Sequence, residues 1–270
     1  MTSLAKTLPI VGAATLAALG LAVPAKADID DWKMLKQAAF GDRAIQSEDG
    51  MVVLEAPQVA DDAALVPIAV RVPPHVKQKL KSLTLFIDKN PDPKIATLTF
   101  GPAAGTGGER SFATRVRVES FSHVRAVLET EDGSLHMATR FVAAAGGCAA
   151  MQAKDPDSET VDLGKTLVKV FPPALEQSPI WSAQVMIKHP NANGMQLDIN
   201  TANFIPARYV REMIVTRGGE LVFKMDSTFS ISTNPNFRFT FGRGQDNSLD
   251  VVITDTDQTR FAAKATPSGS

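Results

Sequence analysis

The stretch His123–Val142, HVRAVLETEDGSLHMATRFV, indicates the fold class of this chain. Two runs rich in apolar and β-branched residues flank Asp132-Gly133, and an Asp-Gly pair between such runs is typical of a β-hairpin. The second run leads directly into AAAGGCAA at residues 143–150. We therefore expect an antiparallel hairpin whose last strand ends at a segment of very small residues.

Upstream of this hairpin the chain has the same character. Short segments rich in β-branched and aromatic residues alternate with turn residues such as Pro, Gly, Asn and Asp. The predicted strands of this half are Met51–Glu55, Val66–Val72, Leu83–Asp88, Ile95–Phe100, Phe112–Val118, His123–Glu129 and Leu135–Val142. Within one of them, Arg115 and Arg117 alternate with Val116 and Val118, as in a half-buried strand. So many short strands predict an antiparallel β-sandwich.

The second half of the chain repeats this pattern. Its predicted strands are Thr166–Phe171, Trp181–Lys188, Tyr209–Thr216, Leu221–Met225, Phe237–Phe241, Leu249–Thr254 and Thr259–Ala263. A short helix is predicted over Asp30–Phe40, with Asp30 or Asp31 as N-cap and Gly41 past its end. The expected fold class is therefore all-β, with two immunoglobulin-like or fibronectin-type antiparallel β-sandwiches and a short N-terminal helix.

The N-terminus has the layout of a secretory signal peptide. Lys6 precedes an apolar run from Leu8 to Val23, and Ala25-Lys26-Ala27 forms a small-x-small cleavage site. The apolar run is too short for a membrane-spanning helix. We expect cleavage after Ala27 and an exported protein with the following organisation: 1–27 signal peptide, 28–147 first sandwich with a C-terminal Gly-Gly-Cys arm, 148–158 cysteine loop and linker, 159–270 second sandwich.

Composition excludes several classes of function. The chain has 28 basic and 29 acidic residues, and this net charge of -1 gives no electrostatic basis for binding nucleic acid or an anionic membrane. It contains no Walker loop, no CxxC pair and no HExxH motif, so the usual signatures of an enzyme are missing. We expect no cofactor.

Cys148 is the one cysteine of the chain. The Ala and Gly residues before it bury little apolar area, so we expect the thiol to be exposed on a mobile loop. The closest basic residues in sequence are Arg140 and Lys154, neither adjacent, so its pKa is expected near the ordinary value of about 8.5. An unpaired cysteine in an exported protein indicates an intermolecular bond or a reactive thiol. The alternative is a small buried hydrophobic residue.

Other candidate sites are weaker. The histidines are scattered at His75, His123, His136 and His189, and a metal site is conceivable only if His123 and His136 meet across the hairpin. Gly105–Gly108 lacks the strand-to-helix context of a phosphate loop and is predicted to be a hairpin loop. Asp255-Thr256-Asp257 lacks the remaining ligands of a calcium loop and is predicted to be a turn. No metal is expected.

The first half of the chain resembles SoxY and the second half resembles SoxZ, the two subunits of the periplasmic sulfur-carrier protein of bacterial thiosulfate oxidation. The segments that carry the resemblance are Leu85–Pro93, Ile95–Phe100, Asp132–Arg140 and Gly146-Gly147-Cys148 on the SoxY side, and Ile187–Pro190, Ile205–Arg208 and Ile231–Pro235 on the SoxZ side. The Gly-Gly-Cys after a final strand is the most specific of them. The chain is most similar to fused SoxYZ-like carriers found beside quinoprotein alcohol dehydrogenases.

The resemblance implies a periplasmic carrier rather than an enzyme. Cys148 would be the residue to which an intermediate is attached, with Gly146, Gly147 and Ala149 as the carrier arm. The implied partners are periplasmic sulfur-oxidation enzymes or a quinoprotein dehydrogenase and cytochrome c, without nucleic acid or membrane, and a disulfide dimer through Cys148 is possible. In the family this arm ends the SoxY chain, whereas here Ala149-Ala150 follow and the arm is tethered at both ends.

Two alternatives stay open beside the carrier. One is a non-catalytic binding or escort module for a periplasmic dehydrogenase or cytochrome, in which the cysteine is incidental. The other is a thiol redox enzyme, against which the lack of a resolving cysteine and of a neighbouring base both argue.

Overall fold

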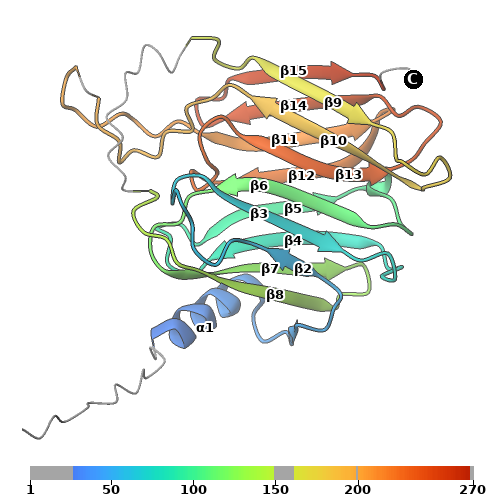
Figure 1. The fold of residues 1–270 in the computed structure, drawn as a ribbon, viewed down its shortest axis with the longest axis horizontal. Helices are drawn as coiled ribbons and strands as arrows, with labels where there is room; N and C mark the ends of the chain where they lie inside the picture. The colour runs from blue at the N-terminus through green and yellow to red at the C-terminus, as the bar shows by residue number, and fades with distance from the viewer. Residues whose placement is uncertain (1–26, 149–160, 199, 268–270) are drawn as a thin grey trace, which may run out of the picture.

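The computed structural model describes residues 27–148, 161–198 and 200–267, and apart from one helix and one 3₁₀ turn its regular secondary structure consists of strands (Figure 1). The first half contains α1 (Ala27–Phe40), β1 (Gln46–Ser47), β2 (Val53–Glu55), β3 (Val66–Val72), β4 (Leu80–Ile87), β5 (Lys94–Phe100), the 3₁₀ turn η1 (Pro102–Ala104), β6 (Arg110–Val116), β7 (Ser122–Thr130) and β8 (Leu135–Val142). The second half contains β9 (Thr166–Phe171), β10 (Ile180–Ile187), β11 (Val210–Arg217), β12 (Glu220–Ser227), β13 (Asn236–Gly242), β14 (Leu249–Asp255) and β15 (Arg260–Ala265).

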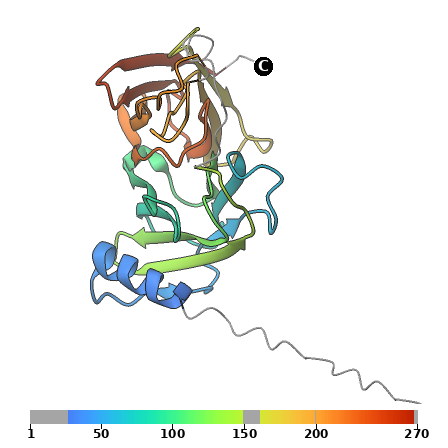
Figure 2. The ribbon, with the colours of Figure 1, turned by 90° about the vertical axis from the view of Figure 1, so that its left-hand side faces the viewer.

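The strands form two sheets, and both halves of the chain contribute to each sheet. The larger sheet has the order β1-β8-β7-β4-β5-β12-β11-β14-β15, and the smaller has the order β2-β3-β6-β13-β10-β9. Figure 2 shows the two layers from the side. The predicted all-β fold with sandwich-like halves is confirmed. The two sandwiches are moreover joined edge to edge, because β5 pairs with β12 and β6 pairs with β13.

The junction between the halves is filled by aromatic side chains. Phe112 of β6 stacks on Phe237 of β13 with ring centroids 6.1 Å apart, and Phe223 of β12 meets Phe239 edge to face at 4.9 Å. All four rings are buried. Alternation along each strand places these rings between the sheets, so a single apolar core runs through both halves.

A buried arginine ties the end of β6 to the second half. The guanidinium of Arg117 donates hydrogen bonds to the main-chain oxygens of Phe229 and Ile231 and to the Thr233 hydroxyl, at 2.7 Å for Ile231 and 3.1 Å for Thr233. The Arg117 amide also donates to the Ser230 oxygen at 2.7 Å. These bonds fix the 229–233 segment against the strand that leads to the cysteine arm.

Helix α1 covers the outer face of the larger sheet near its β8 end (Figure 1). Trp32 and Phe40 pack on Phe86 of β4 with centroid distances of 5.5 Å and 6.0 Å. The helix already includes Ala27, so the prediction of Asp30 or Asp31 as N-cap is wrong, and both residues lie within its first turns. In the part of the chain that the structure describes, no helix is long and apolar enough to cross a membrane.

Two further features differ from the sequence-based expectations. Strand β1 has only 2 residues, too few to show the alternation of side chains by which a strand is recognised in a sequence. It pairs in parallel with β8, with Gln46 opposite His136. The Gly105–Gly108 segment is not a hairpin loop, since it follows η1 and connects β5 of the larger sheet to β6 of the smaller one. The predicted signal peptide lies outside the described residues except for Ala27, and the cysteine-loop linker lies outside them except for Cys148.

Candidate functional site: the cysteine arm

The arm after β8 lies along the end of β6 and along the segment that precedes β3. Ala143 forms a parallel bridge with Val59, and its amide donates to the Gln58 oxygen at 2.9 Å. Farther along, the Gly146 amide donates to the Glu119 oxygen at 2.7 Å and the Gly147 amide to the Val118 oxygen at 3.0 Å. The arm is therefore docked by main-chain hydrogen bonds from its root to Gly147.

Gly147 lies where only glycine fits. A Cβ at this position would lie 2.1 Å from the Ala63 oxygen and 2.6 Å from the Val118 oxygen, both of them backbone atoms. Gly146 has open space around it but a φ of +78°, a conformation that favours glycine. The two glycines thus allow the arm to turn and then to approach the neighbouring backbone closely.

Cys148 is held by both halves of the chain. Its amide donates to the Glu119 carboxylate at 2.7 Å, and its oxygen accepts from the Asn193 side-chain amide at 2.6 Å. Asn193 is itself buried and accepts from the Met195 amide at 2.9 Å. We call Ala63, Val118, Glu119 and Asn193 the cysteine seat.

The thiol in this seat is buried, with only 1% of the Cys148 surface exposed. Burial, followed by the negative charge of Glu119, raises the pKa of the thiol from 9.0 to about 12, and the nearby Arg117 opposes the shift only in part. The expectation of an exposed thiol with an ordinary pKa is therefore wrong for this conformation. The physical reason is that the contacts are made by the backbone of the arm, which the small side chains leave accessible.

Sequence reasoning missed the residues that surround Cys148. Arg140 is the closest described basic residue in sequence, but its Nη1 lies 3.7 Å from Glu48 Oε2. The cation that partly offsets the rise in the pKa of the Cys148 thiol is Arg117 instead. Glu119 directly follows the predicted strand Phe112–Val118, and Asn193 lies between two predicted strands of the second half, but nothing in the sequence places either next to the cysteine. Ala149 and Lys154 lie outside the described residues.

The histidine alternative is not supported by the pairing of β7 with β8. His123 lies opposite Phe141, and His136 lies opposite Leu128, so the two rings do not meet across the hairpin. The His136 ring instead bonds to Asp49 at 2.6 Å. Within the described ranges, no group of three or more His, Cys, Asp or Glu side chains is placed to hold a metal ion.

The Asp255–Asp257 segment is a structural turn. The Asp255 carboxylate accepts from the Thr259 amide and from Arg208, both at 2.9 Å, and Arg208 also reaches Asp257 at 3.0 Å. His189 is buried beside Asp255, and burial lowers the pKa of its imidazole below the ordinary value.

Comparison with known protein families matches each half of the chain to a different family. Residues 36–148 match the family "Sulfur oxidation protein SoxY", and residues 168–266 match the family "Sulphur oxidation protein SoxZ". The first match ends at Cys148. No curated protein matches the chain.

Solved structures similar to the chain include three at low identity. The structure of the sulfur carrier protein SoxY from Chlorobium limicola f thiosulfatophilum is 21% identical with a TM-score of 0.34, over 43% of this chain and 94% of that one. A superoxide reductase (neelaredoxin) from Ignicoccus hospitalis is 14% identical with a TM-score of 0.30, over 37% and 93%. A beta-glycosidase from Bacteroides vulgatus is 10% identical with a TM-score of 0.24, over 87% and 26%. The two family matches, one after the other along a single chain, show that this chain belongs to the fused SoxYZ-like proteins.

Proposed function

We propose that the protein is a non-catalytic carrier in sulfur oxidation that holds a sulfur-containing intermediate on Cys148 and presents it to partner enzymes. The observation that carries the proposal is the place of the sole cysteine. Cys148 closes a glycine-containing arm directly after the last strand of the SoxY half, at the residue where the SoxY family match ends.

The docked arm is the resting state of such a carrier. A thiol reacts as the thiolate, and a pKa of about 12 keeps Cys148 protonated at neutral pH. The seat holds the arm by a small number of hydrogen bonds, and each contributes only about 1 kcal/mol net, somewhat more where a charged group takes part. A partner enzyme that binds the extended arm can therefore draw it from the seat.

The partners and the compartment follow from the same proposal. Sulfur-oxidation enzymes would load and unload Cys148, and a quinoprotein dehydrogenase with its cytochrome c is the second group of candidate partners. The signal-peptide pattern before Asp28 supports export to the periplasm. A disulfide dimer through Cys148 would require the arm to leave the seat first.

One observation favours a second candidate function. Because Cys148 is buried, it resembles a structural cysteine, as expected for an escort module that binds a dehydrogenase or cytochrome without covalent chemistry. The two functions differ in what happens when the sulfur atom is removed.

The test is the intact mass of the mature protein from its native host, isolated without reductant and with free thiols alkylated in denaturant at lysis. A carrier shows an added mass on the Cys148 peptide that a reductant removes, and its Cys148→Ser variant loses growth on reduced sulfur compounds while partner binding survives. A bare alkylated thiol under all growth conditions, together with a fully functional Cys148→Ser variant, would contradict the carrier and favour the escort.

A further inference from the structure

The outer face of the smaller sheet carries a row of side chains that crosses every strand. Pairing places Glu55 of β2 opposite Ala69 of β3, Ala69 opposite Ala113 of β6, and Ala113 opposite Arg238 of β13. The row continues to Gln184 of β10 and Lys169 of β9. Because side chains alternate along a strand, all of these point away from the core.

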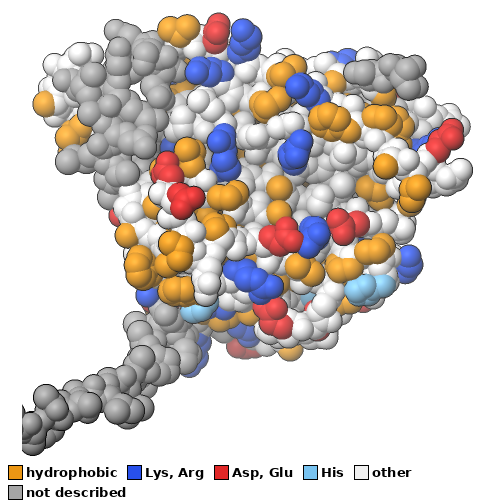
Figure 3. All heavy atoms as spheres, in the orientation of Figure 1, with side chains coloured by type: hydrophobic (Ala, Val, Ile, Leu, Met, Phe, Trp, Pro, Cys, Tyr) orange, Lys and Arg blue, Asp and Glu red, His pale blue; other side chains and the backbone are white. Residues whose placement is uncertain are grey.

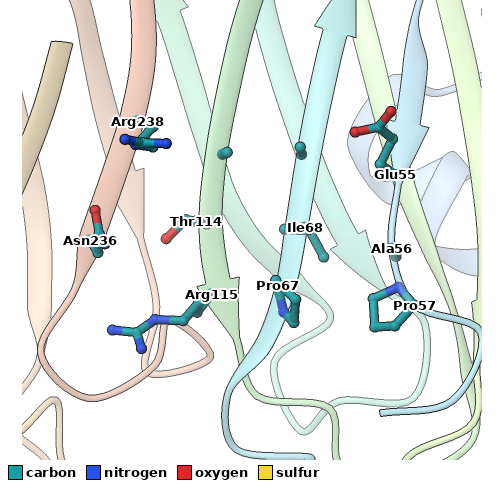
Figure 4. Close-up of a pocket in the computed structure, with 11 residues that line it drawn as sticks. Glu55, Ala56, Pro57, Pro67, Ile68, Thr114, Arg115, Asn236 and Arg238 are labelled. Atoms are coloured by element: carbon teal, nitrogen blue, oxygen red, sulfur yellow. The ribbon is translucent and has the colours of Figure 1, made fainter. Parts of the chain in front are cut away.

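Short side chains in the middle of this row leave the face hollowed. One hollow of about 450 Å³ lies above Ala69 and Ala113 and is bounded by Arg115, Arg238 and Pro67 (Figure 4). A second hollow of about 280 Å³ lies on the other side of Arg238, above Ser111 and Ser182 and beside Phe171. We call the two hollows together, with Arg115, Arg238 and Lys169, the cationic trough.

The cations of the trough lack matching carboxylates. Arg238 is exposed, and among the residues that the structure describes its side chain has no hydrogen-bond or ion-pair partner. Arg115 has a buried Nε without a partner, and its Nη2 makes one long bond of 3.3 Å to the Asn234 oxygen. The one acid of the row, Glu55, is paired with Arg71 and lies on the far side of the hollow from Arg238 (Figure 4).

This arrangement concentrates positive charge on one face of a chain whose net charge is -1. Outward positions on the strands of the sheet carry Arg71, Arg115, Lys169 and Arg238 against the single carboxylate of Glu55. Figure 3 views this face, where some Lys and Arg side chains stand alone and one lies between acidic side chains. The trough therefore complements a negatively charged ligand.

The size of the trough selects the kind of ligand. With strands about 4.8 Å apart, Arg238 and Lys169 are separated by roughly 10 Å across the sheet, farther than a small oxyanion reaches. Apolar side chains line both ends, including Pro57, Pro67 and Phe171. Separated cations with apolar walls suit an extended acidic peptide, whereas a nucleic acid calls for a denser and more uniformly basic surface.

We propose that the cationic trough is a docking surface for an acidic segment of a partner protein, with Arg115 and Arg238 binding its carboxylates. The surface lies close to the cysteine arm, because the chain leaves β6 one residue after Arg115 and reaches Val118 and Glu119 of the seat within four residues. A protein docked in the trough is thus held next to the root of the arm. The binding itself does not depend on the chemistry of Cys148.

The test measures binding of a fluorescein-labelled peptide of about ten residues, in which Glu and Ser alternate, by fluorescence anisotropy at low ionic strength. We expect binding that weakens with added salt, and at least about a tenfold loss in the Arg115→Glu/Arg238→Glu variant and in Arg238→Glu alone. The matched control is Arg211→Glu, an exposed arginine of β11 in the other sheet, which should retain the affinity within about twofold. The Cys148→Ser variant should bind as the natural protein does.

Several outcomes would overturn the proposal. One is failure of the natural protein to bind the Glu-Ser peptide, and another is a loss of affinity in the Arg211→Glu control as large as that in the Arg238→Glu variant. A third is displacement of the peptide by stoichiometric sulfate, and a fourth is a single-stranded oligonucleotide of similar length that binds more tightly than the peptide. An equally long Gln-Ser peptide that binds as well as the Glu-Ser peptide would also overturn it. Unchanged binding to Cys148→Ser, whatever its effect on growth, keeps this result separate from the carrier function.

Discussion

The charge of Glu119 and the burial of Cys148 act in the same direction on the thiol. Both disfavour the thiolate, so they raise its pKa from 9.0 to about 12 in the docked arm. Because docking raises the pKa of the thiol, the docked state has its full stability at low pH, where the thiol is protonated in both states. This stability is lost as pH rises from about 9 toward 12, where the undocked thiol ionises and the docked one does not.

The first prediction concerns the rate at which Cys148 reacts with iodoacetamide. At pH 8 the docked thiol should react on the order of a thousandfold more slowly than a free cysteine, because its thiolate fraction is lower by about that factor. The rate should keep rising with pH well beyond 9. A rate that levels off at pH 8.5 to 9, as for a free cysteine with pKa of about 8.5, would contradict the docked arm.

At the residue scale the sequence predicts strands better than contacts. The strands Val66–Val72, Leu135–Val142 and Thr166–Phe171 are confirmed residue for residue, because alternation and turn residues mark them locally. The burial of Cys148 could not be predicted in this way. Its cause is Gly147, whose missing Cβ admits the Ala63 and Val118 backbones, and these lie far from Gly147 in sequence.

At the scale of elements, the arm is a segment whose docking depends on one glycine. Gly147 is in contact with two backbone oxygens that cannot move aside easily, since the Val118 amide and the Ala63 oxygen are bonded to each other at 2.8 Å. The arm can therefore be released by adding a single methyl group, without changing the cysteine or its charged neighbours.

The second prediction is that Gly147→Ala undocks the arm. The alkylation rate of Cys148 should rise by at least about tenfold toward that of a free thiol, while the free energy of unfolding changes by about 1 kcal/mol or less, because the core is untouched. The matched control is Gly133→Ala, at a hairpin turn with a φ of +85° and open space around it. This control should lose stability through backbone strain alone and keep the slow alkylation rate; an unchanged rate in Gly147→Ala would disprove the role of the glycine.

The pairing of strands between the halves is the element-scale feature that the sequence could not show. Alternation along β6 tells which side chains are buried, but it does not tell whether Ala113 faces a strand of its own half or Arg238 of the other. The same alternation of side chains would be seen if β5 and β6 were the open edge strands of a separate first sandwich. Only the joined structure reveals that β5 and β6 are interior strands.

At the scale of the whole molecule, the shared sheets and the continuous core make the two halves one folding unit. Separating them would expose the edges of β5, β6, β12 and β13 and the aromatic cluster between them. Unfolding of either half therefore removes the partner strands of the other.

The third prediction uses the two tryptophans, one in each half. Trp32 packs on Phe86 in the SoxY half, and Trp181 lies 6.5 Å from Phe241 in the SoxZ half. In Trp32→Phe and Trp181→Phe variants, urea unfolding followed by the remaining tryptophan should coincide with unfolding followed by far-ultraviolet circular dichroism. Separate midpoints within one variant would show that the halves unfold independently.

Under the proposed carrier function, the hydrogen bond from Asn193 to Cys148 would give the SoxZ half a part in deciding which enzymes gain access to the thiol. If the arm is released only about 0.1% of the time, any enzyme that uses it binds about a thousandfold more weakly than its intrinsic affinity. An enzyme with a deep, complementary channel recovers this loss, whereas a chance encounter with a small oxidant or a foreign thiol does not. In such a carrier the docked arm would act as a selectivity filter, and the strength of the seat would set which enzymes can use the thiol.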